Sequence, residues 1–260
     1  MSSFTVYTLF SGSKGNCTYI AGEREHILID AGMPARSIEA SLKSIGISLE
    51  DITDIFITHD HSDHTRGLEQ ICSRYTPRVH ITQPSADVIV TGLTPCLAKQ
   101  ASVHPLVYTE RIGELEISSF ATPHDSNASV GYIVKSPDHV LGFATDVGHV
   151  TDTVRESLTG ADLVILEANH DIDMLTEGSY PAFLKSRILS RYGHLSNDDA
   201  AELVAFLAEH GAKRFMLAHL SEQNNEPEIA FGAVYCALGN IEKRGILLSV
   251  AHPCSPTRLI

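Results

Sequence analysis

Long hydrophobic runs and a basic N-terminus are both missing from this 260-residue chain. No apolar stretch reaches the roughly 18 residues that mark a membrane span. The segment 1–10 has neither a basic region nor a long apolar region. Neither a membrane span nor secretion is therefore indicated, and no membrane partner is expected.

Paired-cysteine motifs are also missing. The five cysteines show no CxxC spacing, and their odd number leaves one unpaired in any disulfide scheme. This usage predicts a reducing, cytoplasmic setting.

Basic charge is scarce. The chain has 19 lysines and arginines against 32 acidic residues, which gives a net charge of −13 with histidine neutral. This balance argues against a surface that coats nucleic acid everywhere, and bound divalent cations would offset part of it. No repeat, low-complexity tract or linker stands out, so one domain over 1–260 is expected, and no obligate protein partner is indicated.

Short apolar runs separated by turn signals predict a strand-rich first part and an alternation of strands and helices in the last third. Strands are expected at 4–10, 17–21, 26–30, 54–57, 79–82, 103–107, 115–120, 130–135, 140–144, 163–166, 214–217 and 245–250. Helices are expected at 34–45, 67–74, 84–90, 182–189, 198–209 and 227–238. This order suggests an α/β fold with two sheets packed face to face and helices on both outer faces.

The densest chemistry lies in the histidine loop, residues 58–64, which follows a short buried strand. His59 and His61 are two residues apart and can point the same way from an extended backbone, while Asp63 and His64 can face a second position. Imidazole and carboxylate are ligands for zinc or a similar divalent ion, so two metals could share this loop. A solvated acidic loop is the plain alternative.

Distant partners test this hypothesis. His124, Asp146 and His219 each follow an apolar run, and Asp30 ends a predicted strand just before Gly32. A single histidine after a strand is usually structural, but together with the loop these residues complete two sets of metal ligands.

In this order along the chain, the set Asp30, His59-x-His61-x-Asp63-His64, His124, Asp146 and His219 resembles the metallo-β-lactamase superfamily. The resemblance implies the αββα sandwich. It also implies that His59, His61 and His124 hold one metal, that Asp63, His64 and His219 hold the other, that Asp146 bridges them, and that Asp30 supports a ligand from behind. Two divalent ions per chain follow, with zinc favoured and manganese as the alternative.

Within the superfamily, the segments 11–16, 166–171 and 193–197 are similar to the YycJ-like (WalJ-like) branch, whose members are described as exonucleases. Glu167 and His194 resemble the pair with which RNase Z-type phosphodiesterases help the leaving group depart. The length leaves no room for a β-CASP domain and no basic tRNA-clamping arm is visible, which argues against RNase J and RNase Z themselves.

The resemblance implies phosphodiester hydrolysis with Asp63, Asp146, Glu167 and His194 as the catalytic residues. Two metals can activate water and stabilise an in-line displacement, and Asp146 could orient the attacking hydroxide. Flavodiiron proteins place Glu at the position of His61, so this histidine favours hydrolysis over oxygen chemistry.

Substrate contacts are less clearly marked. The segment 181–197 contains no acidic residue but carries three cations, which a phosphate site and a solvated helix face explain about equally well. The glycine turn before the second strand could likewise approach an anion or simply connect two strands. The candidate substrate-binding residues are Ser13, Asn16, Arg66, Lys185, Arg187, Arg191, Ser196 and Asn197.

The expected function is a nuclease, most simply an exonuclease acting on DNA. The alternative is a small or cyclic phosphodiester hydrolase of the PhnP kind, which the net acidity favours. Acyl or thioester hydrolysis, as in glyoxalase II, and a scaffold that keeps metals for stability are weaker alternatives.

Overall fold

The computed structural model describes residues 4–89, 95–240 and 245–260, which form two seven-stranded mixed sheets. The first sheet has the order β14-β1-β2-β3-β4-β5-β6. Its strands are β1 (Thr5–Phe10), β2 (Cys17–Ala21), β3 (His26–Ile29), β4 (Asp54–Phe56), β5 (Arg78–Thr82), β6 (Ala101–His104) and β14 (Thr257–Arg258). Pairing is antiparallel from β14 to β3 and parallel from β3 to β6.

The second sheet has the order β13-β12-β11-β10-β9-β8-β7. Its strands are β7 (Thr109–Ile112), β8 (Leu115–Ala121), β9 (Val130–Lys135), β10 (Val140–Ala144), β11 (Leu163–Glu167), β12 (Arg214–Ala218) and β13 (Leu247–Val250). Pairing is antiparallel from β7 to β10 and parallel from β10 to β13.

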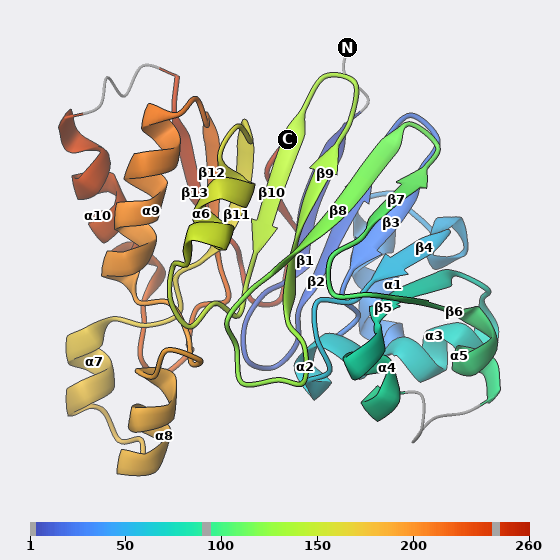
Figure 1. Cartoon of the computed structure of the whole chain (residues 1–260), viewed down its shortest axis with the longest axis horizontal. Helices are drawn as coiled ribbons and strands as arrows, with labels where there is room; N and C mark the ends of the chain where they lie inside the picture. The colour runs from blue at the N-terminus through green and yellow to red at the C-terminus, as the bar shows by residue number, and fades with distance from the viewer. Residues whose placement is uncertain (1–3, 90–94, 241–244) are drawn as a thin grey trace.

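Helices cover both outer faces of the paired sheets, as Figure 1 shows. On the first sheet lie α1 (Ala35–Ser44), α3 (Leu68–Arg74), α4 (Gln83–Ile89) and α5 (Pro95–Gln100), with the 3-10 turn Leu49–Asp51. On the second lie α6 (Asp152–Leu158), α9 (Asn197–Glu209) and α10 (Pro227–Ala237), with the 3-10 turn Leu238–Asn240. The short helices α2 (Ser62–Thr65), α7 (Ile172–Glu177) and α8 (Ala182–Ile188) lie at the lower edge in Figure 1. The αββα sandwich is confirmed.

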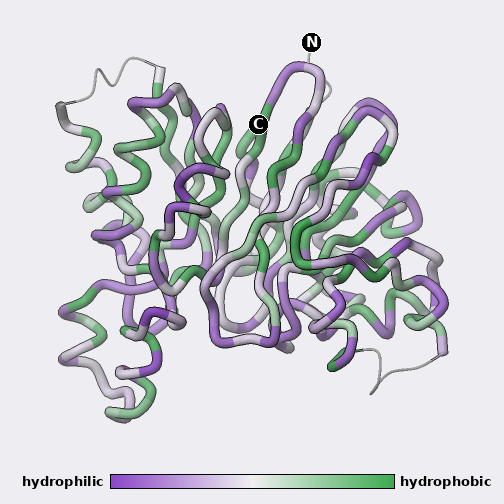
Figure 2. Tube along the Cα trace, viewed as in Figure 1, coloured by the Kyte–Doolittle hydropathy of each residue, from purple (hydrophilic) through white to green (hydrophobic). Residues whose placement is uncertain are grey.

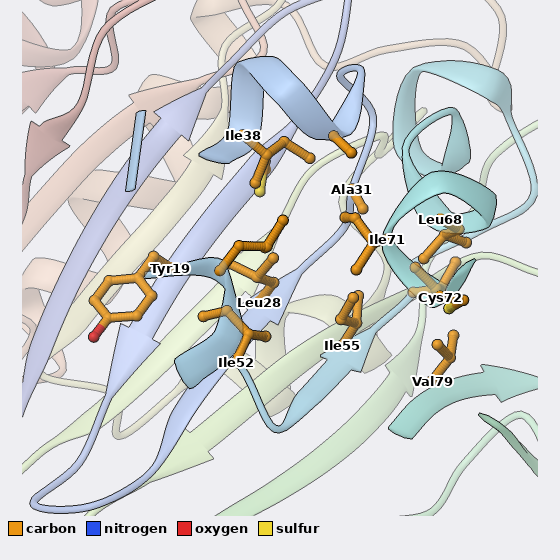
Figure 3. Close-up of a cluster of buried hydrophobic side chains, with 14 of the residues drawn as sticks. Tyr19, Leu28, Ala31, Ile38, Ile52, Ile55, Leu68, Ile71, Cys72 and Val79 are labelled. Atoms are coloured by element: carbon orange, nitrogen blue, oxygen red, sulfur yellow. The ribbon is translucent and has the colours of Figure 1, made fainter. Parts of the chain in front are cut away.

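Three hydrophobic cores follow from strands that are buried on both faces. Successive side chains alternate sides, so Leu28 packs toward the helices while Ile27 packs toward the other sheet, and Ile55 and Phe56 divide in the same way. Figure 3 shows the helix-side core, where Leu28, Ile55 and Val79 face side chains such as Ile38 and Ile71. Green, apolar stretches lie along many of the strands in Figure 2.

Some predicted elements were wrong in extent or missing. The strand expected over 103–107 is β6, which ends at His104 because Pro105 has no amide hydrogen for the sheet. The histidine loop contains one helical turn, α2, which the sequence did not predict. Helices α5, α6 and α7 and strands β7 and β14 were also missed. The helix expected over 84–90 is α4, and Val90 lies outside the described residues.

Within the described ranges, no helix combines the length and the apolar character needed to cross a bilayer.

Candidate metal centre

The candidate ligands meet at one edge of the sandwich, where several strands end. The histidine loop follows β4, and His219 directly follows β12. Asp30 directly follows β3, Asp146 comes two residues after β10, and His124 comes three residues after β8. The parallel strands β3, β4, β11 and β12 deliver their carboxyl ends to this edge, which is where α/β sheets commonly bind ligands.

Three of these residues have left-handed backbone conformations. In the described part of the chain, the non-glycine residues with positive φ are Asp30 (62°), Asp146 (57°) and His219 (57°). Such a conformation costs on the order of 1–2 kcal/mol for an L-residue, so the surrounding structure must hold it in place. All three lie just beyond a strand end, where the turn aims the side chain into the centre.

The ligand candidates form two groups. Nitrogen atoms of His59, His61 and His124 lie within 4.8 Å of one another. Ligand atoms of Asp63, His64 and His219 form a second group with the same spread. These two groups contain six of the seven candidates from the sequence, and Asp146 is the seventh.

Asp146 lies between the two groups and is buried. Its Oδ1 is 3.6 Å from His124 Nε2, and its Oδ2 is 3.2 Å from His64 Nε2. Each group therefore has one oxygen of the same carboxylate beside it, which is the arrangement that a bridging ligand requires.

Hydrogen bonds to Nδ1 fix the orientation of the ligand histidines. His64 Nδ1 lies 2.7 Å from Asp30 Oδ2, and His124 Nδ1 lies 3.0 Å from the carbonyl oxygen of Gly193. Asp30 also accepts hydrogen bonds from the amide and hydroxyl of Thr58, whose Oγ1 lies 3.0 Å from His59 Nδ1. An oxygen acceptor requires Nδ1–H, so Nε2 of each ring keeps its lone pair for a metal.

The fit to a divalent metal rests on orphaned buried atoms. His59 Nε2, His219 Nε2 and Asp146 Oδ2 are buried and have no hydrogen-bond partner. Leaving such atoms unpaired costs about 1–3 kcal/mol each unless another group satisfies them. Imidazole nitrogen and carboxylate oxygen are ligand types for divalent metals, and Asp146 offers a ligand atom within 4.8 Å of one in His59 and of one in His219, so the residues present fit divalent metal ions.

Glu167, at the end of β11, is the hub of the hydrogen bonds that hold this centre: its carboxylate accepts four of them. Its Oε1 accepts hydrogen bonds from His194 Nδ1 and His219 Nδ1, both at 2.8 Å. Its Oε2 accepts from the amides of Val147 and Leu195. Although it lies near Asp146, His194 and His219, its oxygens are fully used, so it orients histidines and is unsuited to binding metal. The link to His219 was not expected from the sequence.

The electrostatics of the centre are dominated by mutual attraction of carboxylates and imidazoles. Burial opposes charge on Glu167, but His194 and His219 outweigh it and lower the pKa of Glu167 to about 2. Burial likewise opposes charge on His219, yet Asp146, Asp63 and Glu167 raise its pKa to about 10. Burial lowers the pKa of His59 and His124. A bound cation would replace the proton that His219 otherwise carries.

The histidine loop is held by backbone contacts that depend on Gly32. The carbonyl of Asp63 accepts from the amide of Asn16, and the carbonyl of Asn16 accepts from the amide of Gly32, both at 2.8 Å. A Cβ on Gly32 would lie 1.6 Å from the carbonyl oxygen of Asp63, so only glycine allows this approach. The Asn16 side chain is buried and does not line the cleft. Its Oδ1 accepts from the Gly12 amide, and its Nδ2 lies 3.1 Å from His64 Nε2 and 3.5 Å from Asp63 Oδ2.

A cleft of about 250 Å³ opens over the centre. Of the predicted residues, His61, Asp63, Asp146, His194, His219, Ser13 and Arg187 line it. The sequence did not single out Tyr180, Leu184, Ile188 or Ser221, which also line it together with Asn169. The spacing of Leu184 and Ile188, four residues apart in the predicted helix, is the signal that could have placed these two on one helical face, whereas Tyr180 precedes the helix.

Other predicted substrate residues lie away from the cleft wall. Arg66 donates to the carbonyl of Lys14, and Lys185 donates to the carbonyl of Thr176. Arg191 hydrogen-bonds to His149 Nε2. Ser196 caps α9 by accepting from the Asp199 amide, and Asn197 is bonded to Asn225. Their contact with substrate stays a prediction.

Arg187 joins α8 to the centre. Its guanidinium forms two hydrogen bonds with Asp125, whose Oδ1 is 3.4 Å from His124 Nε2. An arginine–aspartate ion pair therefore lies at the edge of the candidate metal centre, with Arg187 on the cleft wall.

Comparison with known proteins identifies the family. Residues 25–220 match the family described as the beta-lactamase superfamily domain. The chain is 33% identical to exodeoxyribonuclease YycJ of Bacillus anthracis, over 85% of this chain and 84% of that protein. It is 34% identical to exodeoxyribonuclease WalJ of Streptococcus pneumoniae, over 87% of this chain and 85% of that protein. The fold matches the metallo-beta-lactamase fold protein YhfI of Bacillus subtilis with a TM-score of 0.74 at 13% identity, covering 99% of this chain and 100% of that one. The chain therefore belongs to the metallo-β-lactamase superfamily, in the branch that contains YycJ and WalJ.

Proposed function

We propose that this protein is a dinuclear metal-dependent exonuclease that acts on DNA. Membership of the superfamily makes it a metal-dependent hydrolase, and the YycJ and WalJ relatives are named exodeoxyribonucleases. The observation that carries the proposal is the Glu167–His194 pair, 2.8 Å apart, at the wall of a cleft that also contains the ligand candidates. A histidine held by a carboxylate is suited to protonating a leaving alkoxide.

In this proposal two divalent ions are bound, with zinc favoured and manganese as the alternative. Nitrogen and carboxylate oxygen ligands suit both ions, and the seven candidates exceed what one tetrahedral site requires. His59, His61 and His124 would hold one ion, Asp63, His64 and His219 the other, and Asp146 both.

In this proposal the residues of the centre have different catalytic roles. When bound, the ions would activate water and stabilise the charge that develops on the phosphate. Asp146 and Asp63 would hold the geometry of the centre and orient the attacking group. His194 uses Nδ1 for Glu167, so Nε2 is the nitrogen left to give a proton to the leaving oxygen. Glu167 would hold the orientation of the ring through this hydrogen bond.

Phosphate contacts would come from the edge of the cleft. Arg187 lies on its wall, and Ser13 approaches from the turn between β1 and β2. Because the chain carries a net charge of −13, nucleic acid would be repelled elsewhere, which favours brief engagement and modest affinity.

The second candidate is a small or cyclic phosphodiester hydrolase. The net acidity and the modest cleft of about 250 Å³ favour it, because a small diester needs no groove for a strand.

The test uses bis-p-nitrophenyl phosphate, end-labelled single- and double-stranded DNA, RNA and a cyclic nucleotide, all with metal supplied. Turnover of the first substrate separates a diesterase from an acyl hydrolase and from a scaffold. We expect stepwise shortening of DNA from an end. Hydrolysis of only the cyclic or other small diesters would assign the protein to the second candidate.

A further inference from the structure

His219 is held at both of its peptide groups as well as at its ring. Its amide donates a hydrogen bond to Oγ of Ser11 at 2.7 Å, and its carbonyl oxygen accepts one from Nδ2 of Asn169 at 2.8 Å. Its Nδ1 lies 2.8 Å from Glu167 Oε1. The amide and the carbonyl belong to the peptide groups on either side of the Cα atom, so these two side chains together fix φ and ψ of His219.

These hydrogen bonds explain how a left-handed residue persists beyond the end of a strand. The pairing of β11 with β12 ends at Glu167 opposite Ala218, so His219 lies just past the last pair of the sheet. Its φ of 57° is costly for a residue with a Cβ and persists only where the surroundings hold it. Ser11 is 5% exposed and Asn169 4%, so water hardly competes for these two hydrogen bonds.

Ser11 and Asn169 reach His219 from different sheets. Ser11 directly follows β1 in the first sheet, and Asn169 lies two residues after β11 in the second. Asn169 is itself fixed, because its amide donates to the carbonyl of Leu195 at 2.9 Å and its carbonyl accepts from the amide of Ser221 at 2.8 Å. Only the NH₂ group of a carboxamide can donate, so a substitution that removes it leaves the His219 carbonyl without this donor. His219 is therefore anchored to both sheets.

We propose that Ser11 and Asn169 are positioning residues that hold His219 in its left-handed conformation and so determine how tightly the second ion is bound. This inference rests on the proposed dinuclear centre, in which Asp63, His64 and His219 hold that ion. His219 Nε2, a buried nitrogen without a hydrogen-bond partner, lies 3.8 Å from Asp63 Oδ2. A rotation about φ or ψ would swing the whole ring away from Asp63 and His64. The ion held by the other three histidines should keep its affinity, because those ligands follow β4 and β8.

The test compares the unmodified chain with Ser11→Ala, Asn169→Ala, the double variant, His219→Ala and Asn225→Ala. Asn225 is a matched control: it is 6% exposed, and its Nδ2 donates at 2.9 Å to the carbonyl of Ala168, which is not a candidate ligand. Each metal-free protein is titrated with zinc in competition with a chromophoric chelator, which gives the dissociation constant of each binding step. His219→Ala identifies the step that depends on this ligand, and guanidinium unfolding of the same samples measures stability.

We expect Ser11→Ala and Asn169→Ala each to weaken the His219-dependent step about 10- to 100-fold and to leave the other step unchanged. Because losing either hydrogen bond already releases the conformation, the double variant should lose less than the product of the two single effects. Asn225→Ala should leave both steps unchanged even if it lowers the free energy of unfolding.

Losses of affinity spread equally over both steps, or an equal loss in Asn225→Ala, would indicate a general loss of structure and would overturn the positioning role. An unchanged His219-dependent step in both single variants would also overturn it, while leaving the dinuclear centre intact. If Asn169→Ala does not fold, Ser11→Ala decides the question from the other sheet. If the unmodified chain binds only one ion, the proposed dinuclear centre is wrong and the positioning role with it.

Discussion

Replacing Glu167 by glutamine tests the hub of the centre. The carboxylate accepts four hydrogen bonds, two from the imidazoles of His194 and His219 and two from backbone amides. A glutamine has one oxygen and one NH₂ group, so in either orientation its NH₂ faces two groups that now donate. If the oxygen faces the imidazoles, the amides of Val147 and Leu195 lose their acceptor. If it faces the amides, both imidazoles must move their proton to Nε2, and His219 can no longer bind metal.

The hydrogen bonds of Glu167 set the expected loss of unfolding free energy in Glu167→Gln. Two buried donors left unpaired cost about 1–3 kcal/mol each, or about 2–6 kcal/mol in total. Although burial opposes its charge, the imidazoles of His194 and His219 lower the pKa of Glu167 on folding from 4.5 to about 2, which stabilises the folded state by an amount on the order of a few kcal/mol. Because the folded pKa of Glu167 is lowered, this stabilisation is present above about pH 4.5 and is lost as pH falls toward 2.

The assay is guanidinium unfolding at pH 7 together with elemental analysis of the same samples. We expect Glu167→Gln to lose either about 2–6 kcal/mol of unfolding free energy or metal from the site that contains His219, and to lose diesterase activity in both cases. Glu156→Gln, at an exposed position on α6, is the control and should stay within about 0.5 kcal/mol. A Glu167→Gln protein with the original stability and full metal content would refute this account of the hub.

Three further changes probe separate parts of the centre. Gly32→Ala should lower metal content because its Cβ collides with the carbonyl of Asp63, whereas Gly232→Ala, with no atom within 4 Å of the new Cβ, should not; equal metal content by elemental analysis would contradict the contact. His194→Ala should lose roughly 10²–10⁴-fold in kcat on esters with poor leaving groups, with metal content unchanged and a smaller loss on good leaving groups. Equal losses of kcat on both kinds of ester would contradict the proposed role of His194 in protonating the leaving group. Although burial opposes charge on both rings, the surrounding carboxylates raise the pKa of His219 to about 10 and also raise the pKa of His64, so a metal must displace protons from these rings and the apparent metal affinity should fall at least about tenfold for each pH unit from 8 to 6. Competition with a chromophoric chelator measures this, and an affinity independent of pH would contradict it.

The sequence could predict which candidate ligands the structure brings together because they lie in the histidine loop or just beyond strands. Strand ends are readable from short apolar runs, as with β10 before Asp146 and β12 before His219. The left-handed conformation of Asp146 and His219 is not readable, because it depends on the neighbours that hold each turn. The expectation of one domain over 1–260 stays a prediction.

The substrate-binding residues were harder to predict because the hydrogen-bond partners of a cationic side chain can lie far away in the sequence. Arg191 and Lys185 share an acid-free segment with Arg187, yet only Arg187 of these three lies on the cleft wall. Arg191 bonds to His149, 42 residues earlier, a contact set by how the loop after β10 packs against the segment that follows α8. Local composition gives the sign of the charge but not the direction of the side chain.

The number of metal ions per chain tests the central claim most directly. Protein purified without chelator, or reloaded and dialysed, should contain two divalent ions per chain by elemental analysis. Asp146→Ala should lower that number and abolish turnover of bis-p-nitrophenyl phosphate. One ion or fewer in the metal-replete chain, with Asp146→Ala fully active, would contradict the dinuclear mechanism.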